Sequence, residues 1–432
     1  MGAHPGQFPR VGQRTAAVAA VVLLTAAAAA PLLRAQSSPH EHGHDREVSA
    51  ALLRTGIRGP AAGVSRAPSA ALDPSGRLWL AWAENRYVFV SSSRDEGRSF
   101  EPAVPVNPAP EDIDANSESR PKIAIGPRGQ LYVTYTRAGA KPYTGDVRFS
   151  RSIDAGHSFS TPVTVNDDGV ETGHRFDTLV VGTDGRIVVA WIDKRDVEQA
   201  SRDGRRYDGA ALYYAVSRDE GRTFDRNRKL KDDICECCRL APAVEPGGRV
   251  ALFWRDILPG GIRDHVLGWI GQDSAVGPVT RVAHDGWAID ACPHHGPSLA
   301  ISRDGTYHAV WFTGAGPLGA GAFYARSADR GHSFSEPRRV GRPSAQSHAV
   351  VFAEGRRVWL AWKEPASPEG VTVFVQHSDD EGATWAPAQQ VASTAGSSDH
   401  PFVIGSARGV FVSWFTAAEG YRLVRVTGLA PR

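Results

Sequence analysis

The sequence predicts an all-β protein, and three observations on composition and patterning support this fold class. The 432 residues include 45 glycines and 29 prolines but a single methionine. After the N-terminal segment, no long stretch shows the apolar spacing of an amphipathic helix. Short apolar stretches alternate instead with turns rich in glycine and proline, which is typical of antiparallel sheets.

The charge of the chain is nearly balanced, with 49 Lys and Arg against 47 Asp and Glu. A bulk field this weak gives no reason to expect binding to nucleic acid or to an acidic polymer. We therefore expect no nucleic-acid partner, and we expect the protein to be a monomer.

The N-terminus has the layout of a secretory signal. Arg10 and Arg14 precede an apolar run over residues 15–33, and the small residue Ala35 follows. We expect a signal peptide over residues 1–35, cleaved after Ala35. Because the apolar run is long for a signal, an uncleaved membrane anchor is the alternative. Either arrangement predicts a secreted or periplasmic protein, with no membrane contact beyond this segment.

The remainder of the chain divides into two predicted parts. Residues 36–46 are polar, contain three histidines and are predicted to form a disordered tail. Residues 47–432 are predicted to form one domain, because a single repeat runs through them.

The repeat is marked by an aromatic residue at the end of an apolar strand, which recurs every 51 to 63 residues. The seven aromatics are Trp82, Tyr135, Trp191, Trp254, Trp311, Trp362 and Trp414. A short strand and a Pro/Gly turn precede each aromatic strand, and two more strands follow most of them. Four antiparallel strands at a fixed period predict a β-propeller blade.

Seven repeats predict seven blades, and six blades are the alternative if one strand pair is an insertion. The seventh repeat, over residues 401–426, stops after three strands. Glu47–Arg54, which precedes the first full repeat, could supply the missing strand and close the ring.

The turn between the third and fourth strands carries the motif Ser-x-Asp-x-Gly-x-Ser/Thr-Phe/Trp. Its five copies begin at Ser93, Ser152, Ser217, Ser327 and Ser378. The Asp is expected to accept backbone N–H groups across the turn, the Gly to supply a positive φ, and the aromatic to pack between strands. The motif therefore predicts structure rather than catalysis.

These motifs are Asp-boxes, and over roughly residues 48 to 428 the chain resembles the sialidase-like BNR-repeat propellers, as a divergent member. The resemblance implies an Asp-box β-propeller. It does not by itself imply an activity, because this fold hosts many functions.

One position per repeat, just before the innermost strand, is expected to face the mouth of the central channel. The residues at this position are Arg66, Arg120, Arg175, Arg239, His295, His348 and His400. Guanidinium forks bind carboxylate, phosphate or sulfate at two points, so we expect an anionic and carbohydrate-derived ligand there. The alternative is that these arginines cap strands or pair with neighbouring carboxylates.

Charged residues also follow the aromatic of the second strand, which returns to the same face. They are Glu84, Arg86, Arg137, Asp193, Lys194, Arg195, Arg255, Asp256, Lys363 and Glu364. The mouth is therefore predicted to be a cationic basin with interleaved acids.

The resemblance to sialidases extends in part to their substrate-binding arginines. Ser65-Arg66-Ala67-Pro68 keeps the Arg and Pro of the family's Arg-Ile-Pro motif, and Arg86 stands near the family's second arginine. Any one of three further arginines could complete a triad that grips a carboxylate: Arg120, Arg175 or Arg239.

The catalytic residues of that family have no clear counterpart in this chain. The loop that carries the family's acid/base Asp is missing before Tyr87, and His348 and His400 stand where a nucleophilic Tyr would be expected. Acids near the mouth remain as weak catalytic candidates without assigned roles: Glu118, Asp177, Asp290 and Asp399. A sialidase-like glycoside hydrolase is therefore an alternative function.

All four cysteines lie beside the mouth positions of the fourth and fifth repeats. They are Cys235, Cys237, Cys238 and Cys292. An even number in an oxidising compartment favours two disulfides, one of which would clamp blade four to blade five. Redox-active thiols are a further alternative.

A metal site is the other interpretation of the cysteine and histidine residues in this region. A mixed nitrogen and sulfur ligand set suited to copper or zinc could draw on His294, His295, His348, His400, Cys238 and Cys292. No other cofactor is expected. The sequence thus predicts a secreted propeller that binds an anionic glycan or small molecule, with a hydrolase, a copper or zinc protein, and a scaffold for a protein partner as alternatives.

Overall fold

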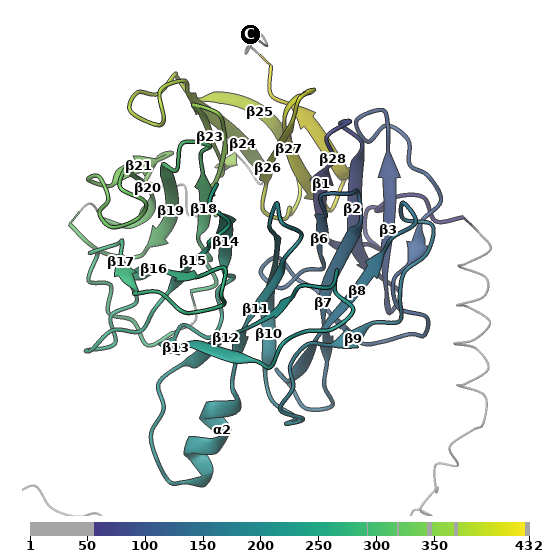
Figure 1. The fold of residues 1–432 in the computed structure, drawn as a ribbon. Coiled ribbons are helices and arrows are strands. Elements are labelled where there is room, and N and C mark those ends of the chain that lie inside the picture. The colour runs from purple at the N-terminus through teal and green to yellow at the C-terminus, as the bar shows by residue number, and fades with distance from the viewer. Residues whose placement is uncertain (1–55, 292, 318, 344–347, 367–369, 428–432) are drawn as a thin grey trace, which may run out of the picture. The chain divides into compact units, whose positions relative to one another are not determined.

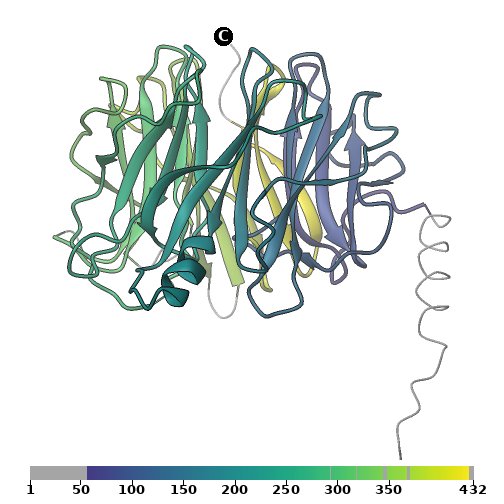
Figure 2. The same cartoon turned by 60° about the horizontal axis from the view of Figure 1, so that its bottom comes forward.

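The computed structural model describes residues 56–427 except 292, 318, 344–347 and 367–369. These residues form a β-propeller of seven blades, as the sequence predicts (Figures 1 and 2). The predicted signal peptide, the histidine-containing tail and the spare strand Glu47–Arg54 lie outside the described residues.

Each blade is an antiparallel sheet whose strands follow one another from the axis outwards. Blade one holds β1 (Arg66–Leu72), β2 (Leu78–Glu84), β3 (Tyr87–Ser93) and β4 (Val104–Pro105), and blade two holds β6 (Lys122–Ile125), β7 (Leu131–Ala138), β8 (Gly145–Ser152) and β9 (Val163–Thr164), with β5 (Ile113–Asp114) added beside β7. Blade three holds β10 (His174–Val181), β11 (Ile187–Asp193), β12 (Ala210–Ser217) and β13 (Arg228–Ile234), and blade four holds β14 (Ala241–Val244), β15 (Val250–Arg255), β16 (His265–Ile270) and β17 (Thr280–Arg281).

The last three blades follow the same order. Blade five holds β18 (Ser298–Ile301), β19 (Tyr307–Thr313), β20 (Gly321–Ser327) and β21 (Arg338–Val340), and blade six holds β22 (Val350–Glu354), β23 (Arg357–Ala366), β24 (Gly370–Ser378) and β25 (Gln389–Thr394). Blade seven has three strands within the described residues, β26 (Phe402–Ser406), β27 (Gly409–Thr416) and β28 (Gly420–Arg425).

The innermost strands form a closed ring around the axis. Each packs beside the innermost strand of the next blade, and β26 of the last blade packs beside β1 of the first (Figure 1). Because every innermost strand runs in the same sense, all seven begin at one face of the ring, here called the mouth.

The aromatic of each second strand is buried between neighbouring sheets, which explains its recurrence. Several of these aromatics also fix an acidic residue two positions later. The indole N–H of Trp82 donates to Glu84 Oε2 over 3.1 Å, and that of Trp191 donates to Asp193 Oδ2 over 2.7 Å. The pairs Trp254–Asp256 and Trp362–Glu364 repeat the contact. These four acids are buried, which differs from their expected place as open groups in the mouth.

The five Ser-x-Asp-x-Gly turns share one hydrogen-bond pattern. In the first, Asp95 Oδ1 accepts the Ser93 hydroxyl at 2.8 Å and the Ser99 backbone N–H at 2.9 Å, while Oδ2 accepts the Ser99 hydroxyl at 2.6 Å. The other four copies make the same three bonds. Since each turn follows a third strand, these turns lie at the face opposite the mouth.

The described residues contain one helix, α2 (Arg195–Arg202), which follows β11 and lies at the lower edge of the ring in Figure 2. Within the described part of the chain, no helix has the length and apolar character needed to cross a membrane.

Candidate functional site

The mouth arginines of blades one and three, Arg66 and Arg175, both lie at a β-bulge. The register between β1 and β2 shifts after Arg66, and the register between β10 and β11 shifts after Arg175. The residue after each arginine, Ala67 or Phe176, has a positive φ of 49° or 55°. Left-handed backbone at non-glycine residues is uncommon and often found where a bulge re-aims a side chain next to a binding site.

Four residues from different blades meet at the axis and form the axial cluster: Glu118, Arg239, His348 and His400. Glu118 Oε1 lies 3.0 Å from Arg239 Nη1, 2.7 Å from His348 Nε2 and 3.2 Å from His400 Nε2. Glu118 Oε2 accepts the backbone N–H groups of Arg239 at 2.9 Å and of Gly296 at 3.2 Å. Both carboxylate oxygens are therefore occupied by donors, so Glu118 is not available as a proton donor to a ligand.

The close approach of the backbone to Glu118 explains why a glycine, Gly296, follows the Cys-Pro-His-His run. A Cβ at Gly296 would lie 2.7 Å from Glu118 Oε2 and 2.8 Å from the Arg239 backbone nitrogen. Carbon atoms do not pack that closely against polar atoms, so a side chain at this position would displace the carboxylate.

The protonation states in the axial cluster follow from burial and charge. Burial alone would raise the pKa of Glu118, but the charge of Arg239 and the hydrogen bond from His348 hold it well below its usual value. Burial lowers the pKa of His348 and, more strongly, that of His400. His348 Nε2 also lies 2.6 Å from the His294 carbonyl oxygen, so this nitrogen carries the proton of the neutral ring.

His295 continues the row of imidazoles without contacting Glu118 directly. Its ring centroid lies 4.1 Å from that of Phe312 and 4.7 Å from that of His348, and the rings of His348 and His400 are 3.4 Å apart. Burial, followed by the repulsion of His348, lowers the pKa of His295 to about 3. These three rings are therefore neutral at neutral pH, and they add no positive charge to the mouth.

Arg120 is also neutralised inside the protein. Its Nη2 lies 2.8 Å from Asp399 Oδ1 and donates to the Ser117 carbonyl oxygen at 2.6 Å, while Nη1 donates to the Pro68 carbonyl oxygen at 3.1 Å. With Glu118 and Arg239, it borders a small channel of about 240 Å³ along the axis. Arg120 and Arg239 thus follow the alternative interpretation, in which mouth arginines pair with neighbouring carboxylates.

A larger cavity of about 520 Å³ opens on the mouth over blades two to five, and we call it the mouth pocket. It is lined by Asn116, Tyr143, Gly173, Arg175, Phe176, Ile192, Lys194, Glu236, Cys237 and His294. Its size falls within the range of about 300–1,000 Å³ that is usual for small-molecule sites. Lys194 in its wall forms an ion pair with Glu236.

Arg175 is a mouth arginine whose fork stays open. Its Nε donates to Asp114 Oδ2 at 2.7 Å, and among the described residues its two Nη groups have no hydrogen-bond partner. The guanidinium lies 5.0 Å from the ring centroid of Phe176 and 5.7 Å from that of Tyr143. Tyr143 is 77% exposed, which is unusual for an aromatic residue and gives the pocket an open apolar face.

A second mouth cavity of about 420 Å³ lies between blades seven, one and two. Arg66, whose side chain is exposed, and Asp399 both line it. Asp399 Oδ2 is buried and has no hydrogen-bond partner within the described part of the chain. Burial would raise the pKa of Asp399, but the charge of Arg120 and its hydrogen bond lower it, so this carboxylate is ionised.

The remaining sequence candidates lie apart from these cavities or are already occupied. Arg86 is half exposed and pairs with Asp112, 3.2 Å from Nε to Oδ1. Asp177 is buried, and its two oxygens lie 2.6 Å and 3.3 Å from the hydroxyls of Thr134 and Thr136. Asp290 is exposed in the connection from β17 to β18. Whether any candidate residue binds ligand stays a prediction.

The described cysteines are unpaired and lie together. Cys235, Cys237 and Cys238 are free thiols, buried in the connection from β13 to β14. The predicted disulfide between two of these three cysteines is therefore wrong. Cys292 lies outside the described residues, and so does the predicted disulfide that would include it. The histidines of the predicted mixed metal set divide: His348 and His400 lie in the axial cluster, whereas His294 is exposed and lines the mouth pocket.

Comparison with known proteins identifies the fold and no family. No family model and no curated protein matches the chain. Among solved structures, the chain is similar to a polysaccharide lyase of family PL25, an ulvan lyase bound to -[GlcA(1-4)Rha3S]-, with TM-score 0.53 and 11% identity over 86% of this chain and 95% of that chain. It is also similar to the polysaccharide lyase Uly1 (TM-score 0.50, 11% identity, 85% and 90% covered) and to the Hadza microbial sialidase Hz136 (TM-score 0.48, 13% identity, 81% and 76% covered). At these identities the likeness establishes the propeller fold alone.

Proposed function

We propose that this protein binds an anionic carbohydrate, one that carries a uronate group, in the mouth pocket. The observation that carries the proposal is the open guanidinium fork of Arg175 beside the rings of Phe176 and Tyr143. A carboxylate accepts two parallel N–H bonds from such a fork, and an exposed aromatic face suits the apolar face of a sugar ring. An ulvan lyase bound to -[GlcA(1-4)Rha3S]- is among the solved propellers to which this chain is similar, which supports the proposal.

The test is a calorimetric titration of the purified protein with hexuronate oligosaccharides and with neutral oligosaccharides of the same length. We expect binding of the acidic series only, weakened by Arg175→Ala. The matched control is Arg303→Ala, which removes an exposed arginine from the turn between β18 and β19, at the face opposite the mouth. If no acidic saccharide binds, or if Arg175→Ala binds as the wild type does, the proposal is wrong.

A second candidate function, hydrolysis of an acidic glycoside such as a sialoside, has one observation in its favour. Asp399 presents an unpartnered, ionised oxygen next to the cavity that Arg66 lines. Cleavage requires a second carboxyl group across the bond, and an ionised Asp399 could serve only as nucleophile or base. Release of a fluorogenic sialoside between about pH 4 and pH 8, abolished by Asp399→Asn, would support this function. Absence of turnover in that range would remove it.

A further inference from the structure

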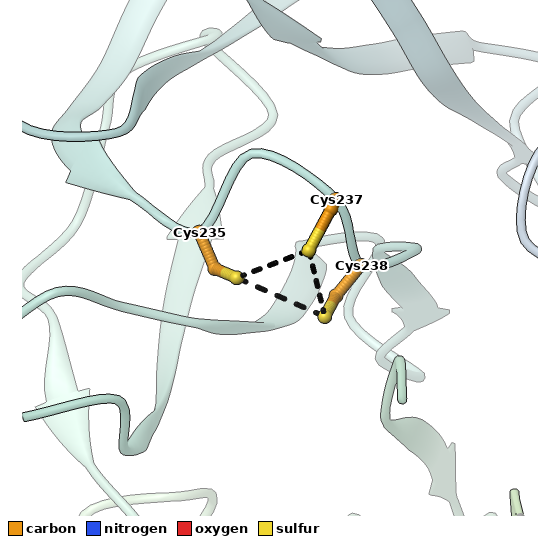
Figure 3. A group of neighbouring side chains, drawn as sticks. All are labelled: Cys235, Cys237 and Cys238. Carbon is orange, nitrogen blue, oxygen red and sulfur yellow. Dashed lines mark hydrogen bonds between the residues drawn. The ribbon is translucent and has the colours of Figure 1, made fainter. Parts of the chain in front are cut away.

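Three cysteine side chains from one short connection point toward a common centre (Figure 3). The Sγ atoms of Cys235 and Cys237 are 3.7 Å apart, those of Cys235 and Cys238 3.8 Å, and those of Cys237 and Cys238 3.9 Å. Each residue is at most 4% exposed. We call this group the thiol triad.

The spacing within the thiol triad is that of ligands to one ion. A thiolate binds Zn²⁺ at about 2.3 Å, so two sulfurs of a tetrahedral site lie about 3.8 Å apart. The sulfurs of a disulfide are about 2.05 Å apart, and three thiols cannot all be paired with one another. All three Sγ–Sγ separations fit the metal geometry, and the triad is nearly equilateral.

The positive charges near the thiol triad also favour a metal site. Arg263 Nη1 lies 3.5 Å from Cys235 Sγ, and Arg263 otherwise donates to the Ile289 carbonyl oxygen. Arg255 is 1% exposed, and its guanidinium donates only to carbonyl oxygens, among them those of His295 and Phe312. Among the described residues, neither arginine has a carboxylate within ion-pair distance.

A buried guanidinium without a counter-charge is costly, so Arg255 indicates that negative charge belongs nearby, and the half-buried Arg263 adds a second cation beside Cys235. Three thiolates around a divalent ion carry a net charge of −1, and around a monovalent ion −2. Either charge would be offset by Arg255 and Arg263, whereas three neutral thiols would offer these cations no charged partner within the triad.

We propose that Cys235, Cys237 and Cys238 form a binding site for one thiophilic d¹⁰ cation, Zn²⁺ or Cu⁺. Soft thiolate sulfur selects these ions over Mg²⁺ or Ca²⁺. Each bound thiol gives up its proton to solvent, so binding releases protons and weakens at low pH. Because Cys237 also lines the mouth pocket, the ion would lie next to the wall of that pocket.

The experiment uses the full chain without an added affinity tag, reduced, loaded with Zn²⁺ or with Cu⁺ and then freed of weakly bound ion. To remove any contribution from the N-terminal tail, all variants carry alanine at His40, His42 and His44. We expect one equivalent of metal per chain, with Cys235→Ser and Cys237→Ser each lowering the affinity by about tenfold or more. The matched control is His348→Gln, which disrupts the axial cluster and should keep the metal.

Two measurements on the protein with all its cysteines remove dependence on the folding of the variants. X-ray absorption at the metal edge should show at least three sulfur neighbours at about 2.3 Å. Substitution with Co²⁺ should give the intense sulfur-to-metal charge-transfer absorption of a thiolate site. Three results would each overturn the proposal. The first is a metal shell of nitrogen and oxygen atoms, and the second is metal that is lost with His348→Gln but kept with Cys235→Ser. The third is a peptide in which a disulfide joins two cysteines of the triad.

Discussion

The axial cluster and the mouth pocket use the same kind of residue in opposite ways. Arg239 and Arg175 occupy equivalent positions at the start of the innermost strands of blades four and three. Arg239 is buried and held by Glu118 through its backbone N–H and its guanidinium. Arg175 is partly exposed and gives Asp114 only its Nε. The repeat therefore fixes where an arginine is placed, and the partner within reach decides whether it holds the protein together or stays open to a ligand.

The largest expected effect comes from removing the charge at the centre of the axial cluster. Glu118→Gln leaves Arg239 buried without a counter-charge, so we expect the free energy of unfolding to fall by about 3–5 kcal/mol. Urea denaturation measures this change. Asp290→Asn, which neutralises an exposed acid, should change the same quantity by less than about 0.5 kcal/mol. Equal effects of the two substitutions would contradict a stabilising role for the buried charge of Glu118.

The second prediction concerns the open arginine. Arg175→Ala should weaken binding of an acidic oligosaccharide by about 1.5–3 kcal/mol, or roughly 10- to 150-fold, because a charged hydrogen-bonded pair is lost. Its effect on stability should stay within about 1 kcal/mol, since the pair with Asp114 is partly exposed. Arg239→Ala should show the reverse, a large loss of stability. Calorimetry and denaturation of both variants test the comparison directly.

The third prediction uses the depressed pKa of His295. An unfolded histidine binds a proton near pH 6.5, whereas folded His295 stays neutral down to about pH 3. Its contribution to stability is therefore complete above pH 6.5 and is lost progressively as the pH falls toward 3. Between pH 7 and pH 5 we expect a loss on the order of 1 kcal/mol from this residue.

The contribution of His295 has to be measured as the difference in unfolding free energy between the wild type and a variant without this histidine. Burial raises the pKa of Asp256 and of Asp285 to about 6, and these groups stabilise the fold as the pH falls through the same range. Denaturation of the wild type and of His295→Asn at pH 7 and pH 5 isolates the histidine. A pH slope unchanged by the substitution would show that His295 gains its proton inside the fold.

The smallest effect is expected at the face opposite the mouth. Asp219 accepts four hydrogen bonds within its turn, from the Ser217 hydroxyl, from the Arg222 backbone N–H, and from the backbone N–H and hydroxyl of Thr223. We expect Asp219→Asn to lower the free energy of unfolding by about 1 kcal/mol or less, which a small fall in the melting temperature would show. Ligand binding should stay unchanged. A change in binding would mean that this face communicates with the mouth.

Most of the fold could be predicted because its signals are local. The spacing of Trp82, Trp191 and their counterparts, together with the turn residues after each strand, repeats within every blade. The position of the mouth residues followed from the same repeat, since each innermost strand starts at one face. The strand expected to complete blade seven stays a prediction, because it lies outside the described residues.

The roles of the mouth residues could not be predicted, because they depend on partners far away in the sequence. Glu118 is 121 residues from Arg239, and no local pattern marks it as the shared acceptor of the axial cluster. Tyr143 lies in the connection from β7 to β8, where the repeat has no fixed residue, so no sequence signal identified it. The thiol triad was visible as neighbouring cysteines, but their convergence on one centre depends on the backbone of that connection.

The axial cluster also affects the stability of incomplete chains during synthesis. Glu118 is made early, and its donors at Arg239 and Gly296 follow 121 and 178 residues later, with His348 and His400 still further on. Contacts this distant in sequence slow folding, because a long loop must close before they can form. A nascent or truncated chain that ends before blade six leaves a carboxylate without its imidazole donors at the centre of an open ring. Such fragments are expected to be less stable than the full-length chain, because the buried carboxylate loses part of its donors.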